Sequence, residues 1–240
     1  EKEIMHSLLN GYPVEKIIGK NVFEAELSLY LSIGFKKIND EIREEVEKTR
    51  PGLSVSFHTL PLVVYKGLGF LSKNRENFLF VGLGEELSEI LLISEGHIKE
   101  IMSFAKGFNV FARRVAFRFN VPLEEGIDLL GNYLQGKLSP EYEQKIEEII
   151  KISFEEFETD LKETFTTLGK EYFLPYNVMV SAPPFLFPKI REILSREMFK
   201  NYTVLRKSFE PELLELKFVE NLLGMETGLA MKIKNNFELA

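Results

Sequence analysis

The pattern of apolar positions is clearest between residues 77 and 122, where it predicts a small sheet followed by a helix. Three apolar segments of strand length occupy 78–83, 87–93 and 98–104, and short turns that contain glycine and glutamate separate them. From 107 to 120 the apolar side chains recur at helical spacing, which is typical of a helix with one buried face. We therefore expect an antiparallel meander that leads into a helix.

This order of elements is also compatible with a phosphate site. A glycine turn and a helix N-terminus can both present backbone N–H groups to an anion. The simpler interpretation is a meander and a helix without any ligand, and lone glycine turns are common enough to favour it. Spacing alone leaves both interpretations open.

Residues 1–72 are expected to form a separate small unit, with a linker at 73–76. We expect a sheet of about three strands in this unit, with its helices packed against it. The pattern predicts, in order, two extended pieces within 3–14, a strand at 23–32, a helix at 36–50, a strand at 53–57 and a helix at 60–71.

Residues 73–240 are expected to form the larger domain. A long apolar stripe over 141–170 predicts a helix that covers the sheet. The short apolar segment 178–180 should join the sheet as a parallel neighbour of the first strand, because helices supply the crossover that parallel pairing needs. Further predicted elements are a helix that begins at Pro122, a helix that includes Ile190 and Met198, a strand at 201–206 and a helix at 211–223.

Composition narrows the class of protein. The chain has 240 residues, 45% of them hydrophobic, which is enough for a core and fits one or two domains. Its net charge of -7 and pI near 5.3 argue against a nucleic-acid partner, since no basic stripe is present. The absence of cysteine excludes disulfides and thiolate chemistry, and the three scattered histidines lack the spacing of a metal site.

The ends of the sequence carry no targeting pattern. No apolar run reaches transmembrane length, and the N-terminus does not resemble a signal peptide. The sequence begins at Glu1 without methionine, inside a segment that already has the pattern of folded protein. We therefore expect a fragment of a longer protein.

Several short motifs, in order, resemble a known family. Residues 8–14 read LLNGYPV, 18–20 read IGK and 23–27 read FEAEL. They look like the start of the small inserted subdomain, of SHS2 type, in FtsA, the actin-like protein that ties the bacterial division ring to the membrane. The stretch 77–122 resembles the second phosphate motif of actin-like ATPases, and within and after it 104–109 and 122–125 resemble the Gly-Asn and Glu-Glu helices that follow this motif. Residues 178–190 lie where the family has its adenosine motif. The set is most similar to divergent FtsA-like proteins of candidate-phylum bacteria.

The resemblance implies a fold of the α/β (α+β) class. Residues 73–240 would form an actin-like (ribonuclease H-like) sheet-and-helix domain, and 1–72 an inserted β-α subdomain similar to FtsA subdomain 1C. Residues 131–142 are too short for the outer subdomain that binds the FtsZ tail in FtsA, so the outer subdomain is expected to be truncated. The membrane-targeting C-terminal helix of FtsA is not evident in 237–240.

The second phosphate motif departs from the family pattern Asp-Ile-Gly-Gly-x-Thr-Thr. Its acid, which would hold the metal or orient water, falls at Gly82, and only Gly84 and Ser88 keep the type of residue. Glu85 and Glu86 place negative charge in a turn that should meet a phosphate, and like charges repel.

The other nucleotide elements are changed as well. The family's nucleotide-contacting Glu and Lys fall at Ile127 and Leu130, and the adenosine Gly-Gly falls at Ala182 and Pro183, where Pro has no N–H to donate. The resemblance therefore implies no catalytic or metal-binding residue and a degenerate nucleotide-binding set: Gly82, Gly84, Glu85, Ser88, Gly107, Ala182 and Pro183.

Three functions follow from these observations. The first is a non-catalytic FtsA-like scaffold or adaptor in bacterial cell division, without a cofactor, that acts through protein–protein contacts with FtsZ, other division proteins or further copies of itself. It would be cytoplasmic, or peripheral at the inner membrane through a partner. The second is an actin-like protein that binds Mg-ATP and hydrolyses it weakly. The third is an α+β interaction module of unknown role.

Overall fold

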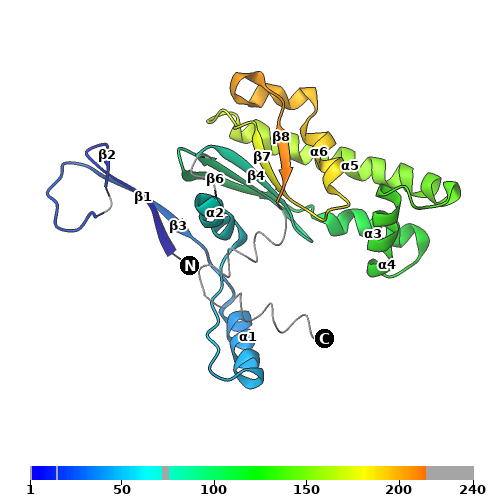
Figure 1. Ribbon diagram of the computed structural model, residues 1–240, viewed down its shortest axis with the longest axis horizontal. Coiled ribbons are helices and arrows are strands. Elements are labelled where there is room, and N and C mark those ends of the chain that lie inside the picture. The colour runs from blue at the N-terminus through cyan, green and yellow to red at the C-terminus, as the bar shows by residue number, and fades with distance from the viewer. Residues whose placement is uncertain (1, 15, 72–75, 215–240) are drawn as a thin grey trace. The chain divides into compact units, whose positions relative to one another are not determined.

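The computed structural model describes residues 2–14, 16–71 and 76–214 (Figure 1). For residues 68–71 it describes the backbone alone. The chain divides into two compact units, 1–68 and 69–240, and each is described by itself. The linker predicted at 73–76 lies outside the described residues except for Glu76.

The small unit has a three-stranded antiparallel sheet in the order β2-β1-β3. Asn10 and Gly11 both have positive φ, 51° and 80°, as the tight hairpin turn between β1 and β2 requires. The Asn10 side chain also accepts hydrogen bonds from the backbone N–H groups of Phe23 and Glu24, at 3.0 and 3.1 Å, which fixes the start of the next strand. The strands are β1 (Lys2–Leu9), β2 (Tyr12–Pro13) and β3 (Ala25–Leu31).

The two helices of this unit form where the pattern predicts, as α1 (Lys36–Thr49) and α2 (Leu60–Leu71). Helix α2 buries Leu62 and Val64, whereas α1 has no buried residue and leaves Ile38 52% exposed. The expectation that both helices pack into the core is therefore wrong for α1, which is mostly charged and holds its polar side chains in ion pairs along its own surface.

The strand predicted at 53–57 is also absent, since these residues have no regular secondary structure. Extended backbone becomes a strand only when another strand pairs with it. In the described part of the small unit, the sheet consists of β1, β2 and β3, and residues 53–57 pair with none of them.

The large unit has a five-stranded sheet in the order β6-β5-β4-β7-β8. The first three strands form the predicted antiparallel meander, and β7 pairs in parallel with β4, with Phe80 opposite Met179 (Figure 1). Both predictions are confirmed. The strands are β4 (Phe78–Leu83), β5 (Ser88–Ser94), β6 (His97–Phe104), β7 (Asn177–Ser181) and β8 (Glu210–Leu213).

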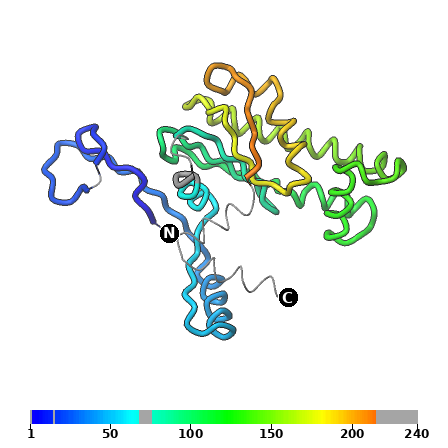
Figure 2. Tube along the Cα trace, viewed as in Figure 1, coloured from blue at the N-terminus to red at the C-terminus, as the bar shows by residue number. Residues whose placement is uncertain are grey.

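In residues 76–214, four α-helices accompany this sheet, and the long one supplies much of the core. Figure 2 follows the chain from the meander through the green helices into the yellow strand β7. Phe157, Leu161 and Phe165 on α5 are fully buried against the sheet and the neighbouring helices, as the stripe predicts. The helices are α3 (Phe108–Phe119), α4 (Leu123–Leu134), α5 (Pro140–Leu168) and α6 (Phe187–Leu194). Among the described residues, none of the helices could cross a bilayer.

The strand predicted at 201–206 is wrong. The chain forms 3₁₀ turns there, η1 (Glu197–Tyr202) and η2 (Val204–Arg206). Leu205 and Arg206 have φ of 61° and 52°, which a strand cannot accommodate. The helix predicted at 211–223 is wrong at its start, because residues 211–213 lie in strand β8. Residues 215–223, like residues 237–240, lie outside the described residues.

The aromatic core of α5 yields a stability prediction. Replacing Phe157 with Ala should lower the free energy of unfolding by about 3–5 kcal/mol, because a cavity is left among fully buried neighbours. Phe117→Ala is the matched control: that ring is 90% exposed, and the change should stay within about 0.5 kcal/mol. Urea unfolding of both variants measures the difference, and equal effects would contradict the packing described.

Candidate functional site

The glycine turn after β4 is bonded directly to the N-terminus of α3. The first N–H groups of α3, from Phe108 and Asn109, donate to the carbonyl oxygens of Gly84 and Glu85 at 2.8 and 3.0 Å. Within the turn, the N–H of Gly84 donates to the carbonyl of Leu87 at 3.0 Å. These helix N–H groups therefore stabilise the turn and do not face an open anion site.

Gly107, directly before α3, allows this close approach. A Cβ atom at this position would overlap the carbonyl group of Glu85 and the carbonyl oxygen of Gly84. Only glycine fits without moving the backbone. Ser88 reinforces the junction, because its buried hydroxyl donates to the carbonyl of Lys106 at 2.7 Å.

Glu86 is held by two side chains of α3. Its carboxylate accepts a hydrogen bond from Asn109 Nδ2 at 3.0 Å and forms an ion pair with Arg113. The hydrogen bond from Arg113, and after it that from Asn109, lowers the pKa of the Glu86 carboxyl. In the described residues, Asn109 Oδ1 is buried and has no hydrogen-bond partner.

Glu89 is a residue of this region that sequence reasoning missed. It lies on β5 directly opposite Gly82 on β4, with Ser103 of β6 on its other side. Partial burial raises the pKa of its carboxyl. The one charged residue inside the predicted 87–93 strand was the available indication, since charged residues are rare in buried strands.

The other positions that the resemblance singles out, the last two predicted site residues and the two apolar replacements on α4, lie in different places. Ala182 and Pro183 follow β7, whose last residue Ser181 lies opposite Gly82, so they lie near the end of β4. The carbonyl of Pro183 accepts N–H groups at the start of α6. Leu130 belongs to the hydrophobic core and is fully buried, and Ile127 is partly buried against that core. The other predicted site residues lie together where the turn between β4 and β5 meets the N-terminus of α3: Gly82, Gly84, Glu85, Ser88 and Gly107.

Ion pairs fix the start of α3 to α5. Lys106 Nζ lies 2.7 Å from Asp160, and Arg114 lies 2.7 Å from Glu156. Both pairs are partly exposed, and each is expected to contribute on the order of 1 kcal/mol or less. In the described part of the chain, no group of three or more His, Asp or Glu side chains could hold a metal ion.

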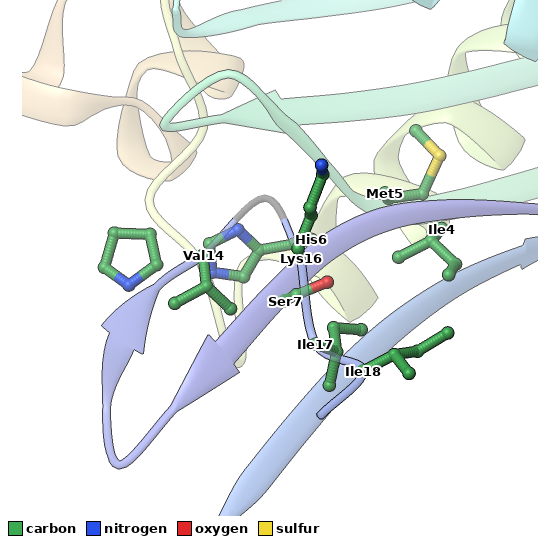
Figure 3. Close-up of a pocket in the computed structure, with 9 residues that line it drawn as sticks. Ile4, Met5, His6, Ser7, Val14, Lys16, Ile17 and Ile18 are labelled. Carbon is green, nitrogen blue, oxygen red and sulfur yellow. The ribbon is translucent and has the colours of Figure 1, made fainter. Parts of the chain in front are cut away.

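The small unit contains a pocket of about 750 Å³ beside β1 (Figure 3). Apolar side chains dominate its wall, and His6 and Lys16 are its titratable groups. The sequence pattern did not indicate it. Its lining residues are Ile4, Met5, His6, Ser7, Pro13, Val14, Lys16, Ile17 and Ile18.

No protein-family model matches the chain, and no curated protein matches it either. Solved structures do. The PilM-PilN type IV pilus biogenesis complex aligns with a TM-score of 0.53 at 16% identity, covering 81% of this chain and 58% of that chain. The fold of the chain is actin-like.

Two other actin-like structures align less closely. Ethanolamine utilization protein EutJ from Carboxydothermus hydrogenoformans gives a TM-score of 0.42 at 17% identity, over 63% of this chain and 48% of that one. MreB 5 of Spiroplasma citri bound to AMPPNP gives 0.46 at 13% identity, over 85% and 68%. The chain thus spans about half to three-fifths of the EutJ and PilM-PilN chains. The FtsA-type identity of the small unit stays a prediction.

The contact at Gly107 can be tested with a pair of glycine variants. Gly107→Ala should destabilise the protein by about 1–3 kcal/mol, because a methyl group forces the turn away from α3. Gly131→Ala should be neutral or stabilising by up to about 1 kcal/mol, since its Cβ would meet the Phe185 ring at an ordinary 3.7 Å inside a helix. Chemical unfolding compares them. A harmless Gly107→Ala would refute the close approach.

The pairing of the Glu86 carboxylate with Asn109 and Arg113, called the Glu86 clamp from here on, predicts how stability depends on pH. Its folded-state pKa is depressed, so the pairing stabilises the protein at neutral pH, and the stabilisation is lost as pH falls through that lowered pKa. Carboxyl chemical shifts followed by NMR should place the Glu86 pKa below that of an ordinary glutamate. Arg113→Met should raise it, whereas Arg118→Met, on the same helix, should not. An unchanged pKa in Arg113→Met would contradict the clamp.

Proposed function

We propose that this chain is part of an actin-like scaffold that acts through protein–protein contacts and does not turn over nucleotide. The observation that carries the proposal is the closed junction between the glycine turn and α3. The N–H groups that an anion would need are donated to the carbonyl oxygens of Gly84 and Glu85.

Charge at the junction supports the same conclusion. Glu86 is kept ionised by Arg113, and Glu85 lies beside it in the turn, so an incoming phosphate would meet negative charge. The residues present therefore do not fit Mg-ATP. Three contacts of the family pattern are missing here: the metal-orienting acid, the nucleotide-contacting lysine and the adenosine glycines. Each lost charged or hydrogen-bonding contact weakens binding by about 1.5–3 kcal/mol, so the loss of all three would remove about 5–9 kcal/mol of binding free energy.

The cellular setting is a finer part of the proposal. The FtsA-like motifs of the small unit support an adaptor in bacterial cell division, with FtsZ, another division protein or a second copy as partner. The alignment to the PilM-PilN complex favours a second candidate, a pilus-type assembly. Direct binding assays with purified FtsZ and PilN from one source organism separate the two settings. Binding to neither, with no self-association, would overturn the adaptor role.

One observation favours the alternative of weak ATP binding. Glu89 is a half-buried acid opposite Gly82, where the family's metal-orienting acid is missing. Its carboxylate could orient a metal-bound water from the neighbouring strand. This alternative predicts that any nucleotide affinity depends on Glu89.

Calorimetry decides between scaffold and ATPase. Titration of millimolar Mg-ATP into the chain should give no saturable heat, and phosphate release should stay at background. Glu89→Gln should then change nothing, and Glu100→Gln on the neighbouring strand serves as the matched control. A micromolar dissociation constant that Glu89→Gln abolishes and Glu100→Gln preserves would establish the alternative.

A further inference from the structure

Two loops at the N-terminal ends of β7 and β8 form an exposed apolar surface. The side chains of Phe173 and Leu205 are 78% and 79% exposed, and Val204 is 41% exposed. Leu174 and Thr203 form an isolated parallel bridge, so the loops are neighbours. Figure 2 shows the orange turn beside the yellow-green segment that follows α5.

This surface is at the opposite end of the sheet from the candidate site. The glycine turn and Pro183 lie at the C-terminal ends of β4 and β7, whereas Phe173 and Leu205 precede β7 and β8. These loops are therefore separate from the candidate nucleotide site.

The turn that carries Leu205 is held in an unusual conformation. Leu205 and the next residue, Arg206, both adopt left-handed backbone angles, which non-glycine residues seldom do. Thr203 is only 2% exposed, and its hydroxyl oxygen lies 2.5 Å from the carbonyl oxygen of Lys207, to which it donates, and 3.0 Å from that of Lys200, which closes the turn. The fold thus keeps a large apolar side chain directed into solvent, against both its conformational preference and the hydrophobic effect.

Cations outnumber acids on these two loops. Lys170, Arg206 and Lys207 are exposed there beside one exposed acid, Glu171, although the chain as a whole carries a net charge of -7. The Lys207 ammonium group lies 4.6 Å above the Tyr176 ring, which orders it. Apolar tips beside cations are complementary to a membrane with anionic lipids, where the tips enter the headgroup boundary and the cations meet phosphates.

We propose that Phe173, Val204 and Leu205 insert into the surface of an anionic membrane, while Lys170, Arg206 and Lys207 contact its lipid phosphates. This goes beyond the scaffold role, because it places the chain on the membrane directly and not through a partner. A lipid surface fits better than a peptide, since these side chains are exposed at the ends of loops and do not line the pocket beside β1.

The first test uses a tryptophan reporter, because the chain contains no Trp. Phe173→Trp creates a single fluorophore at the proposed surface. Phe117→Trp is the matched control, at a phenylalanine on α3 that is 90% exposed. With vesicles of phosphatidylethanolamine and phosphatidylglycerol in equal parts, emission at 173 should shift to shorter wavelength and be quenched by brominated lipid. Emission at 117 should not change. Equal responses, or none, would overturn the proposal.

Sedimentation with the same vesicles measures the energetics. The double variant Phe173→Ser/Leu205→Ser should lower membrane partitioning about tenfold or more, since two apolar side chains no longer leave water. Arg206→Gln/Lys207→Gln should weaken binding several-fold at low salt and have little effect at high salt. Phe117→Ser should bind like the unchanged chain, and circular dichroism checks that every variant is folded.

Two results would contradict the proposal. One is an unchanged chain that does not sediment with anionic vesicles. The other is a chain that self-associates in analytical ultracentrifugation through Phe173 and Leu205 without binding vesicles, which would make the loops a contact between copies.

Discussion

Strand β4 is the element on which the large unit depends. It pairs with β5 in an antiparallel ladder and with β7 in a parallel one, and all six of its residues are buried. A strand with this position must be apolar on both faces, because helices or other elements exclude water from each side of the sheet. Its C-terminal end then determines where the glycine turn lies, and the turn determines where α3 begins.

The junction between this turn and α3 shows how one close contact changes the chemistry of a site. Gly107 lets the helix approach the carbonyl groups of Gly84 and Glu85, and the helix N–H groups are satisfied there. If these N–H groups faced an anion and not carbonyl oxygens, the junction would be a phosphate site. Here the ion pair between Glu86 and Arg113 adds a second link between the turn and α3. The polar groups of the region therefore stabilise the fold itself.

The two ends of the sheet therefore have different properties. At the C-terminal ends of β4 and β7, Glu86 is paired with Asn109 and Arg113, and Glu85 and Glu89 add further acids. At the N-terminal ends of β7 and β8, Phe173 and Leu205 are exposed beside cations, and a strained turn maintains that exposure. A scaffold has use for such an arrangement, because its activity lies in the surfaces that it presents and not in a reaction.

The sequence by itself determined the elements whose stability is local or periodic: the meander, β7 and the helices α3 to α6 follow from apolar spacing, and the order of short motifs indicated the actin-like fold. Tertiary structure decided the rest. Residues 53–57 lack a strand because no neighbour pairs with them, and residues 201–206 turn because the buried Thr203 hydroxyl closes the backbone. At the candidate site, the glycines and acids were identified, but their pairing with α3 joins residues more than twenty positions apart. Such contacts depend on how elements pack, which no local pattern encodes.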